Sequence, residues 1–110
     1  MSPEPAAVRI ALTTIGSLEE GQTLARLLVE RRLAACVNLV PSLQSIYCWK
    51  GAIEEASEVL LFIKTSAEFL PALETAMREL HPYDLPEFLV LDIASGSQPY
   101  IDWLLSSVQG

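Results

Sequence analysis

The chain has 110 residues, of which 51% are hydrophobic, and a formal net charge of −7 at pH 7, which suits a single folded domain and excludes a disordered chain. Its seven basic residues are scattered, which argues against nucleic acid as a partner because phosphate binding needs a clustered basic surface. The sequence has no apolar run of membrane-spanning length and no signal-peptide pattern at its N-terminus, so we expect a cytoplasmic protein without membrane contact.

The first elements of the chain are predicted to be a strand and a helix. Residues 1–7 predict a loose, proline-containing tail, and the β-branched and aliphatic run at 8–15 predicts a strand. Ser17 and Glu20 have the spacing of a capping box, in which each side chain bonds to the backbone amide of the other residue. We therefore expect a helix from this point to about Leu33.

A long hairpin is predicted next. Residues 34–40 and 45–49 predict a second strand that Pro41 interrupts, because proline cannot donate to the ladder and indicates an edge or a bulge. A tight turn then leads into a third strand over 52–64. This hairpin is long for so small a domain.

The last part of the chain predicts a helix, a strand and a further helix. Thr65 and Glu68 repeat the capping-box spacing, and the helix that follows must end near His81, because a proline comes directly after it. Residues 88–94 predict a fourth strand, and residues 96–108 predict a short C-terminal helix.

The resulting order, β-α-β-β-α-β-α, predicts a single α+β domain over residues 8–110. A split β-α-β arrangement with a four-stranded antiparallel sheet and helices on one face satisfies it most simply. In the third strand both alternating sets are apolar, so the sheet face without helices needs another cover, and a second copy of the chain is the simplest one. These sets are Val59, Leu61 and Ile63 on one face, and Leu60 and Phe62 on the other.

Four blocks of the sequence form a recognisable series. They are "RLAACVN", "SIYCWKG", "EVLLFIKT" and "HPYDLPE". Their order and spacing resemble those of the CutA family of divalent-cation tolerance proteins, and the similarity spans roughly residues 8 to 108. The resemblance implies a ferredoxin-like subunit, a tight homotrimer, an architecture similar to the PII signalling proteins, and a link to copper and other divalent metals. Some members carry a cysteine associated with copper in the first strand. The matching position here is Thr13, so Cys36 and Cys48 would have to take its place.

The stretch "HPYDLPE" is the first candidate for a metal site. Its imidazole and carboxylate groups suit copper or zinc, and a rigid Pro-Tyr turn could bring them together. The alternative for His81 is structural, since an imidazolium at a helix C-terminus complements the helix dipole. The predicted metal ligands are His81, Asp84, Glu87 and Cys36.

A second set of residues predicts a ligand cleft between subunits. Tyr47 and Trp49 are two apart on a strand and point to one face, and the ammonium of Lys64 needs a carboxylate partner, for which Glu87 is a candidate. Such a cluster could hold a small ligand or could only orient the subunits. The predicted cleft residues are Trp49, Tyr47, Lys64, Tyr83, Tyr100 and Trp103.

The remaining candidate residues have simpler interpretations than a binding site. Glu54, Glu55 and Glu58 predict a solvated acidic face on the hairpin. No Gly-rich phosphate loop, nucleophile elbow or metal-hydrolase motif is present, so the sequence predicts a binding protein, with an enzyme that uses His81 or Glu87 as a weaker alternative.

Taken together, these patterns predict a homotrimer that binds a divalent metal, copper foremost, and contributes to metal tolerance. The alternative is a PII-like regulatory or assembly module that binds a small molecule or a partner protein in its intersubunit clefts.

Overall fold

The structure, a computed structural model, describes residues 7–108, so the predicted tail lies outside the described residues except for Ala7. The element order agrees with the prediction. The elements are β1 (Val8–Ile15), α1 (Leu18–Glu30), β2 (Cys36–Trp49), β3 (Ala52–Ser66), the 3-10 helix η2 (Ala67–Phe69), α2 (Leu70–Leu80), β4 (Leu89–Asp92) and α3 (Gln98–Ser107).

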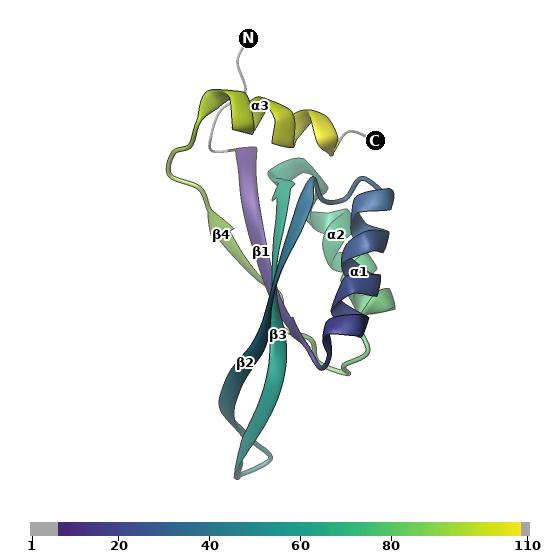
Figure 1. Ribbon diagram of the computed structural model, residues 1–110, viewed down its shortest axis with the longest axis vertical. Coiled ribbons are helices and arrows are strands. Elements are labelled where there is room, and N and C mark those ends of the chain that lie inside the picture. Colours follow the sequence, from purple (N-terminus) through teal and green to yellow (C-terminus); the bar gives the residue numbers. More distant parts are fainter. Residues whose placement is uncertain (1–6, 109–110) are drawn as a thin grey trace.

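The strands form one four-stranded sheet in the order β2-β3-β1-β4, and every neighbouring pair is antiparallel. Helices α1 and α2 lie on one face of the sheet, whereas α3 crosses the end opposite the hairpin tip (Figure 1). The predicted split β-α-β fold is therefore confirmed. The hairpin of β2 and β3 extends well beyond the helices, and the molecule measures 51 Å along its longest axis.

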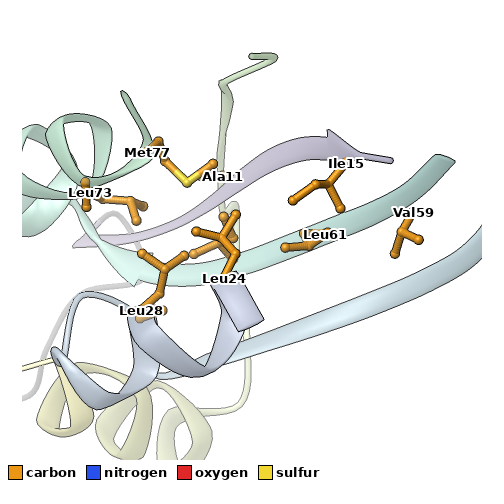
Figure 2. Packing of buried hydrophobic residues seen from close by; sticks show 11 residues of the cluster. Ala11, Ile15, Leu24, Leu28, Val59, Leu61, Leu73 and Met77 are labelled. Atoms are coloured by element: carbon orange, nitrogen blue, oxygen red, sulfur yellow. The ribbon is translucent and has the colours of Figure 1, made fainter. Parts of the chain in front are cut away.

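The hydrophobic core lies between the sheet and helices α1 and α2. Ile15, Leu61 and Ile63 point from the sheet toward Leu28 and Leu73, and each of these side chains is at most 1% exposed. Figure 2 shows this packing, in which strand and helix side chains interdigitate. Burying an aliphatic side chain of this size contributes about 1.5–3 kcal/mol, so this layer fixes the register of the central strands.

Strand β1 carries one polar residue into this core. Thr13 faces the helices, is 0% exposed, and pairs across the ladder with Leu61. Its hydroxyl Oγ1 has no hydrogen-bond partner within the described part of the chain. An orphan buried hydroxyl is unfavourable. Its position in the core also places Thr13 away from any surface site.

The structure corrects the prediction that Pro41 interrupts the second strand. Strand β2 continues through it, with a register shift between Val40 and Leu43 that marks a β-bulge. Ser42 adopts a φ of 62° in this bulge. Because β2 is also the edge of the sheet, the missing amide of Pro41 interrupts no inner ladder. The bulge and edge were therefore predicted correctly, and the interruption was not.

Two predicted helix boundaries are also wrong. Helix α1 ends at Glu30, because Arg32 adopts a φ of 60° and Leu33 N–H donates back to Leu28 O at 3.0 Å. Thr65 is not a helix cap. It belongs to β3, is 0% exposed, and donates from Oγ1 to Leu33 O at 2.8 Å, so its hydroxyl joins strand to loop.

The other sheet face leaves apolar side chains in solvent. Leu60 and Phe62 are only partly buried there, and their neighbours Val40, Leu89 and Leu91 are 42%, 60% and 46% exposed. A patch of this kind on one chain indicates an interaction surface. Among residues 7–108, no helix is both long and apolar enough to cross a membrane.

Candidate functional site

His81 fixes the loop that connects α2 to β4. Its backbone N–H donates to Met77 O at 2.9 Å and ends the helix, as predicted. Its buried ring lies with Nε2 2.8 Å from the carbonyl oxygen of Thr14, and Nδ1 accepts the Tyr83 N–H at 3.1 Å. Since a carbonyl only accepts and an amide N–H only donates, we assign a neutral imidazole with its proton on Nε2. Both ring nitrogens are thus engaged.

Tyr83 joins this loop to the hairpin. Its hydroxyl donates to Glu58 Oε2 at 2.7 Å, and its ring lies 4.7 Å from that of His81. Burial, and then the hydrogen bond and the negative charge of Glu58, raise the pKa of Tyr83 well above its ordinary value. The short bond therefore holds the loop against β3 with the phenol protonated.

Glu58 corrects the prediction of a solvated acidic face. Glu58 is only 8% exposed, whereas Glu54 and Glu55 on the same strand are exposed. Sequence reasoning missed Glu58 as a site residue. The one available signal was its position directly before Val59, where the buried apolar run of β3 begins.

A cavity of about 670 Å³ lies between the hairpin and this loop. It brings together two groups that are distant in sequence, one from β2 and β3 and one from residues 83–87. Its polar and aromatic lining residues are Thr14, Ser45, Tyr47, Trp49, Glu58, Tyr83, Asp84 and Glu87, and Ile46, Ala56 and Leu85 complete it.

The other predicted cleft residues lie at the opposite end of the sheet, where α3 packs against β3. Lys64 Nζ donates to the Tyr100 hydroxyl at 3.2 Å and lies 5.4 Å from the centre of its ring. The Trp103 ring is 5.3 Å from that of Tyr100. The partner of Lys64 within one chain is thus Tyr100 rather than Glu87, and one chain carries the predicted cleft as two separate halves.

The predicted metal ligands are divided in the same way. Asp84 and Glu87 line the cavity, but Cys36 lies on β2 opposite Lys64, with its Sγ 3.9 Å from Asn38 Oδ1. Residues 7–108 contain no group of three or more His, Cys, Asp or Glu side chains close enough to hold one metal ion. Both cysteines are free thiols, and Cys48 is exposed near the hairpin tip. Metal binding by these residues stays a prediction.

The comparison with known proteins agrees with the fold and with the sequence blocks around the cavity. The model of the family described as CutA1 divalent ion tolerance protein matches residues 9–107. The chain belongs to this family.

Two relatives show how far the similarity extends. The divalent-cation tolerance protein CutA of Thermus thermophilus is 48% identical over 95 residues, which cover 86% of this chain and 92% of that protein. Protein CutA of Mus musculus is 46% identical over 100 residues, covering 91% of this chain. The matched region spans only 56% of the mouse protein, so this chain corresponds to about half of the longer relative.

A solved structure supports the architecture. The PII-like protein CutA from Nostoc sp. PCC 7120, in its apo form, superposes with a TM-score of 0.85 at 42% identity, covering 92% of this chain and 97% of that chain. Membership in the family associates the chain with divalent-cation tolerance in general.

Proposed function

We propose that this chain binds divalent cations, copper foremost, and contributes to metal tolerance as a cytoplasmic homotrimer. The observation that carries the proposal is the acidic cavity of a chain with a net charge of −7, in which Glu58, Asp84 and Glu87 attract cations. The description of the family supports the link to divalent ions. Binding rather than catalysis is part of this proposal.

The division of the ligands supports assembly. Cys36 belongs to the Lys64 end of the sheet and Asp84 and Glu87 to the hairpin end, so a complete set needs residues from more than one copy. Head-to-tail packing about a rotation axis would join opposite ends of neighbouring chains and close into a ring. It would also bury the exposed apolar residues of the open sheet face, such as Leu89 and Leu91.

Coordination by His81 has a defined cost. A metal ion at Nδ1 would displace the Tyr83 N–H, and a metal ion at Nε2 would displace the contact with Thr14 O. Losing one such hydrogen bond costs about 1 kcal/mol, which strong imidazole coordination offsets. We therefore propose that the metal ion first contacts Asp84 and Glu87, and that His81 and Cys36 complete the site after the loop between α2 and β4 adjusts.

Calorimetric titration of Cu²⁺ and Zn²⁺ into the chelator-stripped protein tests this function. We compare wild type with His81→Ala and Glu87→Gln, and with Glu55→Gln as a matched control, because Glu55 is an exposed carboxylate outside the cavity lining. Saturable wild-type binding that both His81→Ala and Glu87→Gln weaken and the control retains supports the proposal. Equal binding by all four proteins overturns it. Sedimentation equilibrium tests the trimer separately.

A second function is favoured by the aromatic walls of the cavity. Tyr47, Trp49 and Tyr83 give it the apolar surface of a small-molecule site, so a PII-like regulatory or assembly module that binds a small molecule or partner protein is the alternative. Its binding would survive chelation and depend on Trp49, whereas binding through a metal would not.

A further inference from the structure

The open face of β3 carries opposite charges at its two ends. Side chains alternate along a strand, so Glu58 and Lys64 lie on the same face as Leu60 and Phe62. The two charged residues are about 20 Å apart along the strand and cannot pair within one chain. Neither forms an ion pair with any other residue of 7–108. One chain therefore leaves a carboxylate at one end of this face and an ammonium at the other without a counter-charge.

Aromatic rings accompany both charges. At the cavity end, Tyr47 and Trp49 line the hollow beside the hairpin and are 45% and 46% exposed in one chain. At the α3 end, Tyr100 and Trp103 stand beside the ammonium and are 44% and 46% exposed. Each end of the sheet is thus half of a site, with ring faces and charge of a single sign.

Head-to-tail assembly joins the two halves. The proposed rotation axis places the α3 end of one copy against the cavity of the next, since these ends lie at opposite ends of the sheet (Figure 1). The charged residues among the cavity lining are all acidic, namely Glu58, Asp84 and Glu87, and the incoming Lys64 supplies the opposite charge. The shared cleft then has an ammonium on one wall, carboxylates on the other, and rings between them.

The fixed positions of the two charges leave room for a ligand between them. The Lys64 ammonium is held by the Tyr100 hydroxyl at 3.2 Å, and Glu58 Oε2 is held by the Tyr83 hydroxyl at 2.7 Å. The cavity between the hairpin and residues 83–87 measures about 670 Å³, within the roughly 300–1,000 Å³ of small-molecule sites. A molecule with one positive and one negative group can satisfy both walls at once, and a flat apolar body can stack on the rings.

We infer that the cleft between subunits binds a small zwitterion with an aromatic body, of the class to which aromatic amino acids belong. Its carboxylate accepts from Lys64 of one copy, its ammonium donates to Glu87 of the next, and its ring lies against Trp49. The inference rests on the second proposed function, small-molecule binding, and on the homotrimer. The site is incomplete in a single chain.

A ligand series on the wild-type assembly tests the chemical class. Calorimetry compares L-phenylalanine with phenethylamine, which lacks the carboxylate, and with 3-phenylpropionate, which lacks the ammonium, in the chelator-stripped protein. Each comparator loses one charge-assisted hydrogen bond, so we expect each to bind at least about tenfold more weakly than phenylalanine. Binding of either comparator as tight as that of phenylalanine refutes the zwitterion.

Two variants assign the charges to their partners. Lys64→Gln should weaken phenylalanine binding about tenfold and phenethylamine binding much less, and Glu87→Gln should weaken phenylalanine about tenfold and 3-phenylpropionate much less. The control is Glu55→Gln, which removes a charge of the hairpin outside the cavity lining and should leave all affinities unchanged. Equal weakening by the control refutes the site. Circular dichroism and sedimentation equilibrium check fold and assembly, and the ligand series decides the class without any variant.

Co-expression of Lys64→Gln and Glu87→Gln chains decides whether the site is shared between copies. Neither variant alone has both groups, but random mixing joins an intact Lys64 to an intact Glu87 of the neighbouring copy at about a quarter of the interfaces. We expect tight phenylalanine binding to return at about this fraction of sites. A site within one chain would recover nothing, so no recovery refutes the placement between subunits.

The same titrations separate this inference from the proposed functions. If phenethylamine or 3-phenylpropionate binds in a manner that depends on Trp49 and phenylalanine does not bind, small-molecule binding stands and the ligand class is wrong. If none of these compounds binds, the inference is refuted, and titration with Cu²⁺ shows separately whether the metal function stands.

Discussion

Replacing Thr13 with valine should stabilise the protein. Thr13 is 0% exposed between the sheet and the helices, and its Oγ1 has no partner in the described part of the chain. Valine has nearly the same shape and favours strands, so the substitution removes an unsatisfied hydroxyl and leaves no large cavity. Burying such a group costs about 1–3 kcal/mol, and we expect the free energy of unfolding to rise by about 1–2 kcal/mol.

Thr65→Val is the matched control. Thr65 is equally buried and lies on β3, but its Oγ1 donates to Leu33 O at 2.8 Å. The same change there leaves the carbonyl without its donor and should lower the free energy of unfolding by about 1–3 kcal/mol. Both substitutions replace a hydroxyl with a methyl group, so their opposite signs isolate the hydrogen bond from packing.

Thermal unfolding followed by circular dichroism measures both variants. A change of 1 kcal/mol shifts Tm by roughly 4–8 °C in a domain of this size, which is easily resolved. All samples need one protein concentration, because the Tm of an oligomer depends on it. If Thr13→Val lowers Tm, or if both variants shift it in the same direction by similar amounts, the attribution to the unsatisfied hydroxyl is refuted.

Three further predictions concern backbone strain and ionisation. Arg32 adopts a φ of 60° after α1, so Arg32→Gly should raise the free energy of unfolding by about 1 kcal/mol in urea denaturation; no gain would argue against strain there. Lys50 and Gly51 have φ of 51° and 82°, as a type I′ turn requires, and Lys50→Asn should therefore stabilise the hairpin and raise Tm, whereas Lys50→Val should lower it. Burial and Glu58 raise the pKa of Tyr83, so in spectrophotometric titration the tyrosinate absorbance that Tyr83→Phe removes should develop only well above pH 10. The stability that the protonated Tyr83 contributes is complete below about pH 10 and is lost as the pH rises toward the pKa of the folded state. A difference spectrum that appears near pH 10 would contradict this.

Local patterns were sufficient for the fold. The apolar residues on both alternating faces of β3 predict a sheet that is covered on each side, and the proline after His81 fixes the end of α2. The errors lie where a long-range contact overrides a local signal. Thr65 has capping spacing, but pairing with β1 extends β3 to Ser66 and places its hydroxyl against Leu33. A capping pattern indicates only which hydrogen bonds a residue could make, and the tertiary contacts decide which of them form.

The site was harder to predict, because its residues come from the hairpin and from residues 83–87, which are distant in sequence. Glu58 follows the exposed Glu54 and Glu55 on the same strand, and the sequence does not distinguish it from them. Its burial becomes visible only when the structure places Tyr83 against it. The side chains Tyr47 and Trp49 were assigned to one face from their spacing, but their separation from Lys64 and Tyr100 depends on the sheet as a whole. Spacing gives the face of a strand and not its distance from another element.

The two engaged nitrogens of His81 link the metal and small-molecule proposals. The same contacts that hold the loop at the cavity, with Thr14 O and the Tyr83 N–H, must be broken in part for His81 to bind a metal. Tyr83 in turn holds Glu58 through its hydroxyl, so a metal at His81 would loosen the wall that shapes the cavity. A ligand that needs Glu58 and Tyr83 in place should therefore weaken metal binding at His81, although the ligand does not contact His81. Bound Cu²⁺ should therefore lower the affinity of the cavity for an aromatic small-molecule probe, and His81→Ala should abolish this negative coupling. Independent binding of the two would show that the metal leaves His81 in its present bonds.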